Sequence, residues 1–212
     1  MDIPVKQKIE AFFTQFKSQT YKKGEILIRA DEAPSGVFYL KEGAIKQYLI
    51  SRKGTELVVN MFKPGSFSPM SWAINNSENI FYFEAATLCE VHKAPRERVL
   101  IFLKENPDVV FDLISRVYRG TDGLLLRMAY LMSGDAYERL ITELLIQAKR
   151  FGTKNVQDIT LTLNEKDLAN QAGLTRETVS RELKKLKEKN LAIYTKGIIL
   201  IPRLEDLESE LL

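Results

Sequence analysis

The 212-residue chain has very little of what metal sites and disulfides require. Cys89 is its only cysteine, so the chain can form no internal disulfide and no self-contained zinc–thiolate or iron–sulfur site. His92 is its only histidine, so a cupin-like metal oxygenase site, which needs several histidines and a carboxylate, cannot be assembled. No nucleophile elbow or phosphate-binding loop is present either. We therefore expect a protein that is not an enzyme and that has no cofactor or bound metal.

Long hydrophobic runs are also missing. No stretch of about 18 apolar residues occurs, so no membrane span is expected. The N-terminal residues, MDIPVKQKIE, lack the basic-then-apolar order of a secretory signal. Together with the single cysteine, these features predict a cytoplasmic protein that does not associate with membranes.

The most informative stretch that is present runs from Asn164 to Leu186 and predicts two short helices joined by a tight turn. Asn164 and Thr175 can cap the two helices, because short polar side chains accept hydrogen bonds from unpaired N–H groups. Gly173 lies at the corner, where a residue without Cβ turns most easily. Apolar residues recur at helical spacing and can pack the two helices together; they are Leu168, Ala172, Val179, Leu183 and Leu186.

The opposite face of the second helix carries Arg176, Glu177, Ser180, Arg181 and Lys184. A recognition helix in the major groove of DNA needs such a face, with forked donors and a carboxylate. A charged, solvated surface is the plainer explanation. The turn, the caps and the small residues favour DNA binding.

The distribution of charge supports this interpretation. The chain has a net charge of only +3, but residues 137–203 contain 13 basic and 8 acidic residues, a net charge of +5. The last nine residues carry four acids and no base, and we expect them to lie away from DNA. A basic segment around a two-helix motif is the electrostatic pattern of phosphate binding.

The region from Tyr21 to Ala94 has a different sequence pattern, in which short runs of residues that favour β-strands are separated by glycines. The glycines lie 7 to 12 residues apart, at Gly24, Gly36, Gly43, Gly54 and Gly65. Short strands at such regular spacing predict a β-sandwich or barrel.

A long helix is predicted to follow Asn106-Pro107, with apolar residues recurring at alternating steps of four and three. They are Val110, Ile114, Val117, Thr121, Leu124, Met128 and Leu131. This heptad pattern predicts a dimer interface, and the alternative is a helix packed on its own sheet. Gly120 and Gly123 weaken the helix and could serve either close backbone approach or a bend.

The segment Met132–Asp135 breaks that helix and is the predicted hinge. Further on, the residues from Ala192 to Pro202 predict a hairpin that turns near Lys196-Gly197, which would be the wing of a winged helix. We therefore predict an α+β fold of three parts: a β-roll (jelly-roll) effector or sensor domain over 1–105, a dimerisation helix over 106–132, and a winged helix-turn-helix domain over 133–212.

This order of elements resembles the CRP/FNR family of bacterial transcription regulators over nearly the whole chain. The strongest local matches are the string TRETVSR over 175–181 and the turn at Gly173, and FKPGSF over 62–67 and CEV over 89–91 match typical sensor positions. The resemblance implies a homodimer that binds a two-fold DNA site near promoters and contacts RNA polymerase.

Carried over residue by residue, the resemblance implies that Arg176, Glu177 and Arg181 read bases and that Ser180 helps to discriminate half-sites. Arginine can fork onto guanine, and glutamate can accept from cytosine. The half-site should be related to TGTGA or TTGA, and the residues of this helix do not decide between the two sequences. Phosphate contacts, which position the protein without reading sequence, are expected from Thr175, Thr178, Lys184 and Lys196.

The sensor region departs from the cyclic-nucleotide-binding members of the family. Those members carry a Gly-Glu pair and a later Arg-Ser/Thr-Ala, whereas here Gly65 is followed by Ser-Phe-Ser and the later position reads Asn79-Ile80-Phe81. A buried cyclic phosphate would have no charged partner, which is costly. We therefore expect no binding of cAMP or cGMP.

Other sensor chemistries also find little support. An FNR-type cluster needs several cysteines. Haem ligation by Cys89 and His92 is disfavoured, because residues three apart on a strand point to opposite faces. What is present is an aromatic-rich set that forms either plain sandwich core or a candidate effector pocket for an apolar or aromatic ligand: Phe67, Met70, Trp72, Phe81 and Phe83. A sensor without any ligand is a third possibility.

The function predicted from the sequence is therefore a DNA-binding transcription regulator. The alternative is a regulatory module whose winged helix binds a protein instead of DNA. The base-reading set on the second helix argues against that alternative.

Overall fold

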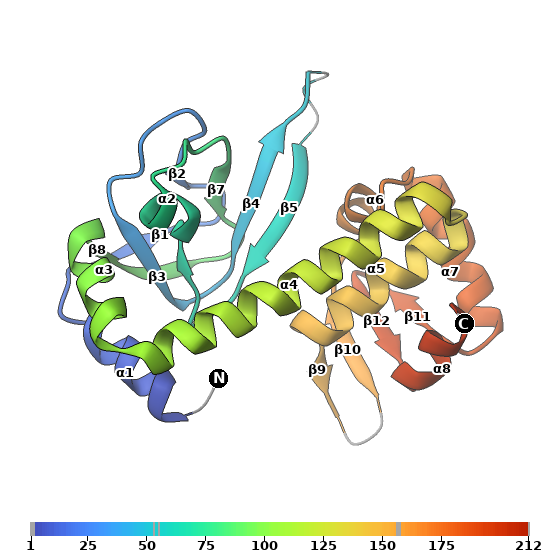
Figure 1. The fold of residues 1–212 in the computed structure, drawn as a ribbon. Coiled ribbons are helices and arrows are strands. Elements are labelled where there is room, and N and C mark those ends of the chain that lie inside the picture. Colours follow the sequence, from blue (N-terminus) through green and yellow to red (C-terminus); the bar gives the residue numbers. More distant parts are fainter. Residues whose placement is uncertain (1–2, 53, 55, 156–157, 212) are drawn as a thin grey trace. The chain divides into compact units, whose positions relative to one another are not determined.

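A computed structural model describes residues 3–52, 54, 56–155 and 158–211. Its contacts divide the chain into two compact units, Met1–Val117 and Tyr118–Leu212 (Figure 1). The division falls inside one long helix, α4 (Pro107–Ser133), so each unit includes part of that helix. None of the described helices is both long and apolar enough to cross a bilayer.

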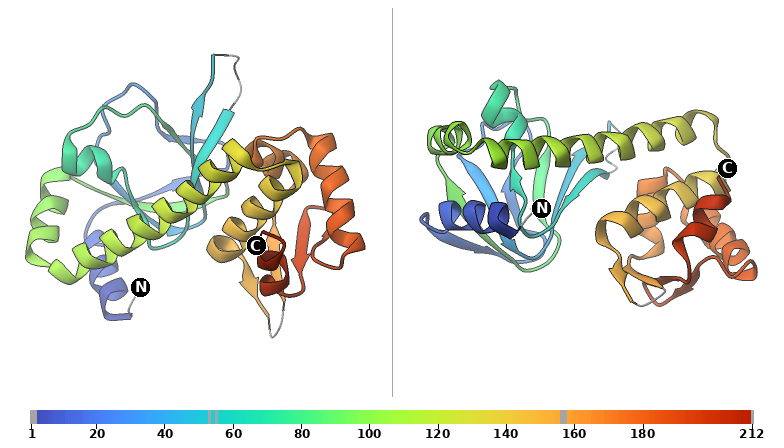
Figure 2. Two further views of the ribbon diagram at one scale, coloured as in Figure 1. Left: turned by 45° about the vertical axis from the view of Figure 1, so that its right-hand side comes forward. Right: turned by 60° about the horizontal axis from the view of Figure 1, so that its bottom comes forward.

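The first unit contains two four-stranded antiparallel sheets, which confirms the predicted β-sandwich. One sheet has the order β1 (Ser18–Tyr21), β8 (Cys89–Ala94), β3 (Val37–Glu42), β6 (Phe67–Ser68). The other has the order β2 (Ile26–Ile28), β7 (Tyr82–Ala85), β4 (Ile45–Ile50), β5 (Glu56–Phe62). Three helices accompany the sheets: α1 (Ile3–Phe13), α2 (Met70–Asn75) and α3 (Arg96–Glu105) (Figure 2).

The predicted glycine turns adopt backbone conformations that favour glycine. Gly43, between β3 and β4, has φ of 92°, and a Cβ added there would collide with the carbonyl oxygen of Leu88. Both its conformation and this close approach exclude larger residues. The strands can therefore follow one another tightly enough to close the sandwich.

Two apolar clusters form the core of this unit. The first takes residues from both sheets, including Phe38, Ile45, Phe83, Cys89 and Val91. The second packs the sheet of β1, β8, β3 and β6 against α1 and α3; its buried residues are Val5, Ile9, Phe13, Val37, Tyr39, Phe67, Ala73, Ala94, Val99, Phe102, Leu103 and Val109. Strands β3 and β8 of that sheet are thus covered on both faces.

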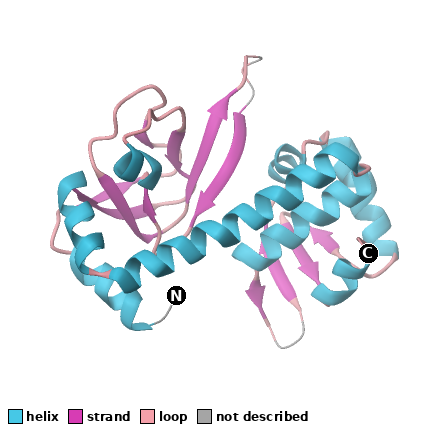
Figure 3. Cartoon of the chain, viewed as in Figure 1, coloured by secondary structure: helices cyan, strands magenta, loops and turns pink. Residues whose placement is uncertain are grey.

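The second unit is a winged helix-turn-helix, as predicted. After the second half of α4 come α5 (Ala136–Phe151), β9 (Thr153–Lys154), β10 (Ile159–Thr162), α6 (Glu165–Ala172), α7 (Arg176–Glu188), β11 (Ile193–Thr195), β12 (Ile198–Ile201) and α8 (Leu204–Ser209). The strands form one antiparallel sheet of order β11-β12-β10-β9 (Figure 3). One cluster of buried residues from α5, α6, α7, the sheet and α8 holds the unit together.

The break between α4 and α5 lies where the sequence predicts it. α4 ends at Ser133, and Asp135 caps α5 in a reciprocal capping box with Glu138. α4 itself continues through Gly120 and Gly123, and a Cβ at either glycine would meet no atom within 4 Å in the described structure.

Candidate nucleic-acid interface

The geometry of the two-helix motif follows from its caps and its corner. The side chain of Asn164 accepts from the main-chain N–H of Asp167 at 2.9 Å, and that of Thr175 accepts from Thr178 at 3.2 Å. Gly173 ends α6 in the left-handed region, with φ of 63°. All three predictions are confirmed, and together they fix where each helix begins and where the chain turns.

The apolar back of the motif is buried as predicted. Leu168 of α6 and Val179, Leu183 and Leu186 of α7 belong to the same core cluster, and Ala172 of α6 is buried as well. Burial of this face leaves the opposite side of α7 to solvent.

That exposed side lines a shallow groove of about 600 Å³. It brings together the four residues predicted to read bases and one predicted phosphate contact, and the full lining is Glu165, Arg176, Glu177, Ser180, Arg181 and Lys184. Glu165, which comes from α6, was not among the predicted site residues. Two further predicted phosphate contacts, Thr175 and Thr178, lie at the start of α7, and their hydroxyl oxygens are 3.0 Å apart.

Lys196 lies outside this groove lining, at the tip of the wing. Thr195 pairs with Ile198 across a two-residue turn in which Lys196 has φ of 47° and Gly197 has φ of 84°. Two successive positive φ values are typical of the tight turns that suit antiparallel hairpins. The predicted wing is confirmed, and its exposed tip carries a positive charge.

Both arginines that are predicted to read bases are tied to carboxylates through Nε. Arg176 Nε lies 3.2 Å from Oε2 of Glu165, and Arg181 Nε lies 3.0 Å from Oε1 of Glu182. Glu182 also pairs with Lys185 at 2.6 Å. Each bond uses Nε, so it does not consume the terminal Nη donors that fork onto a base edge.

Two carboxylates of α7, those of Glu182 and Glu177, are held in their charged form. Burial raises the pKa of Glu182, but hydrogen bonds from Lys185 and Arg181 outweigh burial and leave that pKa below its ordinary value. At Glu177, a bond from its own main-chain N–H and one from the Thr175 hydroxyl lower the pKa. Glu177 is therefore an ionised acceptor at neutral pH, as base reading requires.

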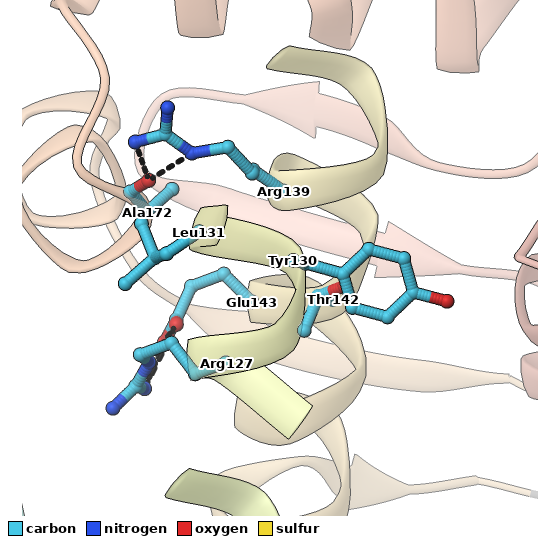
Figure 4. A pocket seen from close by; sticks show the side chains of 7 residues that line it. All are labelled: Arg127, Tyr130, Leu131, Arg139, Thr142, Glu143 and Ala172. Carbon is cyan, nitrogen blue, oxygen red and sulfur yellow. Dashed lines mark hydrogen bonds and ion pairs between the residues drawn. The ribbon is translucent and has the colours of Figure 1, made fainter. Parts of the chain in front are cut away.

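The turn of the motif is also held from α5 (Figure 4). Arg139 donates from Nε and Nη2 to the carbonyl oxygen of Ala172, at 3.2 and 2.9 Å, and also to that of Gly173. In the same region Arg127 of α4 forms two bonds, of 2.9 and 3.0 Å, to Glu143, whose side chain is only 1% exposed. The cavity between these residues measures about 10 Å³, which is room for about one water molecule.

The exposed face of α4 is broader than the predicted seam. Ile114, Val117, Leu124, Met128 and Leu131 are exposed, whereas Val110 packs on the core of the first unit. A second column at steps of seven is more exposed still, from 58% at Leu125 to 84% at Met132, and consists of Phe111, Tyr118, Leu125 and Met132. Its period of seven was the signal in the sequence that would have found it.

The five residues of the candidate effector pocket do not come together. Phe67, Met70 and Trp72 belong to or pack on the cluster that contains Phe13. Phe83 belongs to the cluster between the sheets, and Phe81 packs against that cluster. The two groups therefore line different parts of the core.

Cys89 and His92 also lie on different sides of their strand. The thiol of Cys89 is buried and donates to the carbonyl oxygen of Ala44 at 3.1 Å. His92 is also buried, and its Nδ1 lies 2.9 Å from the carbonyl oxygen of Phe16. Among the described residues, no group of three or more histidine, cysteine, aspartate or glutamate side chains is placed to hold a metal ion.

Two family models match the chain. A Crp-like helix-turn-helix domain matches residues 138–210, and a cyclic nucleotide-binding domain matches residues 18–106. The global nitrogen regulator of Nostoc sp. strain PCC 7120 is 30% identical over 189 residues, covering 85% of this chain and 83% of that protein. The cAMP-activated global transcriptional regulator CRP of Salmonella typhimurium is 23% identical over 185 residues, covering 86% and 88%. Among solved structures, a CooA mutant from Carboxydothermus hydrogenoformans has a TM-score of 0.78 at 22% identity, covering 95% and 90%.

Proposed function

Because the chain belongs to the CRP/FNR family of DNA-binding transcription regulators, we propose that it acts as a homodimer on a two-fold symmetric promoter site. The observation that carries this proposal is the groove on α7, where two arginines, a carboxylate and a hydroxyl face solvent on one helix side. Both arginines are held by neighbouring carboxylates.

In this proposal, Arg176 and Arg181 each fork onto O6 and N7 of a guanine, and Glu177 accepts from N4–H of a cytosine. Ser180 lies between Arg176 and Arg181 in the sequence of α7, and it influences the choice between TGTGA-like and TTGA-like half-sites. Thr175 and Thr178 meet phosphates at the N-terminus of α7, where unpaired N–H groups and the helix dipole favour anions.

Lys184 and Lys196 contribute charge without reading sequence. Lys184 lines the groove, and Lys196 extends from the wing, so the two lysines approach the backbone from different elements. Contacts of this kind set affinity and its dependence on salt, whereas the arginines set preference for sequence.

The proposed dimer uses the exposed apolar face of α4. A single-sided column of leucine, valine and methionine in water is costly, at about 25 cal/mol for each Å² of apolar surface that could be buried. A second copy of the same helix covers that face with matching residues, and a two-fold interface pairs each residue with its equivalent. Gly120 and Gly123, whose Cβ positions meet no described atom within 4 Å, allow two such backbones to approach closely.

The proposed effector, if the sensor unit binds one, is not a cyclic nucleotide. Asn79 stands where the cyclic-nucleotide binders carry their cation. Its side-chain amide donates to the carbonyl oxygens of Arg29 and Phe81 at 2.8 and 2.9 Å. This residue therefore holds a loop together and offers no charge to a phosphate. An apolar or aromatic compound remains the proposed class of effector, and a sensor unit without any ligand remains the alternative. Contact with RNA polymerase, which membership of the family implies, is part of the same proposal.

Selection of bound sequences from random DNA tests this function directly. The purified protein, with and without cell extract, should enrich a palindrome with half-sites related to TGTGA or TTGA. Enrichment of no sequence, together with equal affinity for all duplexes, would contradict the proposal. An effect of extract on enrichment would show that an effector acts.

A further inference from the structure

We propose that Glu165 is a positioning residue that determines how strictly Arg176 discriminates between bases. This inference rests on the proposed function, because it concerns the same groove. It adds to that function a residue on α6 that touches no base itself and acts through the arginine it holds.

The pairing joins the first residue of each helix of the motif. Glu165 opens α6, and Arg176 opens α7. The side chain of Glu165 is 14% exposed, whereas that of Arg176 is 70% exposed, with 3.2 Å between Oε2 and Nε. Packing thus fixes the carboxylate, and the carboxylate in turn restrains a long side chain that would otherwise sample many rotamers.

The start of α6 is also a favourable place for the acidic side chain of Glu165. Asn164 caps the helix by accepting from Asp167, and Glu165 sits in the first turn with Asp167. Carboxylates are stabilised at this end of a helix by the macrodipole and the unpaired N–H groups. The acidic partner of Arg176 therefore lies where the helix itself favours it.

The geometry of the bond suits base reading. It engages Nε, and the two Nη atoms that match O6 and N7 of guanine are on the other edge of the guanidinium plane. Glu165 can keep its bond while Arg176 contacts a base. Ordering the side chain before DNA arrives lowers the entropic cost of forming the specific contact.

Ordering Arg176 favours the cognate site over random DNA, because only the cognate site offers the base edge that the ordered side chain contacts. The restraint by Glu165 therefore raises the ratio of specific to non-specific affinity.

Glu182 provides a contrast within the same surface. It holds Arg181 from the next position of the same helix and is 3% exposed, so it belongs to the core side of α7. Glu165 lines the groove itself and reaches across from the other helix. Removing Glu165 therefore perturbs the reading face without opening the core.

The experiment compares binding to the selected palindrome and to a random duplex at one salt concentration. Glu165→Asp keeps the charge but shortens the reach, and Glu165→Gln removes the charge. Both should lower the specificity ratio about three- to tenfold per half-site, since ordering one long side chain is worth about that factor. Glu188→Gln, at an exposed position of α7 outside the groove lining, removes the same charge and should leave the ratio unchanged.

The background Arg176→Ala separates this inference from the proposed function. If Glu165 acts through Arg176, neither Glu165 variant should change the ratio further in that background. An unchanged ratio in both single variants, an effect of Glu165→Gln alone, or an effect that persists in Arg176→Ala would each overturn the inference. If Arg176→Ala itself leaves the guanine preference intact, the base-reading assignment fails instead. Circular dichroism melting of every variant confirms that α6 remains folded.

Discussion

Arg139 donates from Nη2 to the main-chain carbonyl oxygen of Ala172 at 2.9 Å and thereby caps α6 from a neighbouring helix. The last carbonyls of a helix have no partner within it, and the turn after α6 leaves them near a cation that satisfies them. The corner between α6 and α7 is thus set by Gly173 and also by an arginine more than 30 residues earlier. The orientation of the reading helix depends on both.

Replacing Arg139 by alanine should loosen that corner. The carbonyls of Ala172 and Gly173 would lose charge-assisted bonds, which are worth about 1.5–3 kcal/mol when one partner is charged. Main-chain amides around residues 170–176 should exchange with deuterium correspondingly faster. Arg203→Ala, which removes an exposed pair with Asp206, should alter the exchange at that corner little. Equal exchange in the two variants would show that the cap contributes nothing.

Replacing Arg181 and replacing Lys196 by alanine should affect DNA binding in two different ways. Arg181→Ala should lose about 1–3 kcal/mol per half-site and relax the preference at one base pair. Lys196→Ala should weaken all sequences similarly and reduce the salt slope by about one. Titrations of specific and random duplexes at several salt concentrations measure both effects. Uniform weakening by both variants would mean that α7 is only an electrostatic patch.

The oligomeric state should depend on the exposed face of α4. The double variant Leu124→Asp, Met128→Asp should be monomeric, because dimerisation would bury carboxylates against a symmetric copy. Leu126→Asp is the matched control, since Leu126 is also exposed but lies outside the two apolar columns. It should remain dimeric by light scattering. A dimer in the double variant would place the interface elsewhere.

Acid should reduce the contribution of Glu182 to stability. Its folded-state pKa is lowered, so its contribution is present above the ordinary value of 4.5 and is lost as the pH falls through the folded-state pKa. Glu182→Gln lacks this dependence. The difference in Tm between the two proteins should therefore be larger at pH 7 than below pH 4, and a difference that grows on acidification would contradict the direction of the shift.

Cyclic AMP and cyclic GMP should not bind at physiological concentrations. Calorimetry with each nucleotide tests this, and a micromolar dissociation constant for either would refute it. The buried side chain of Asn79 would then have to give up its bonds to Arg29 and Phe81, or another cation would have to serve.

The parts of the site that the sequence predicts are those set by short-range rules. Caps, the left-handed corner and the outer face of α7 follow from residues three or four apart, and the structure confirms them. The pairing of Glu165 with Arg176 spans 11 positions across a turn, so no helical period indicates it. The cap from Arg139 is more remote still.

The sandwich shows the same limit. Glycine spacing predicted the strands, but strand periodicity does not say which sheet each strand joins. Phe67 on β6 and Phe83 on β7 fall on different sheets and in different clusters. The sequence pattern alone did not separate these two residues. The column of Phe111, Tyr118, Leu125 and Met132 has a local period of seven and could have been predicted, but it lies outside the a and d positions that define the predicted seam.

The ion pair of Arg127 with Glu143 constrains how this protein can evolve. Glu143 also accepts a bond of 2.7 Å from Gln147, so its carboxylate sits fully inside the unit with two partners. Losing Arg127 alone strands a buried charge, a cost of about 3–5 kcal/mol, whereas replacing the pair together by apolar residues is often neutral. A change at only one of the two positions therefore gives a poorly folded protein. The two positions should therefore change together along a lineage or not at all.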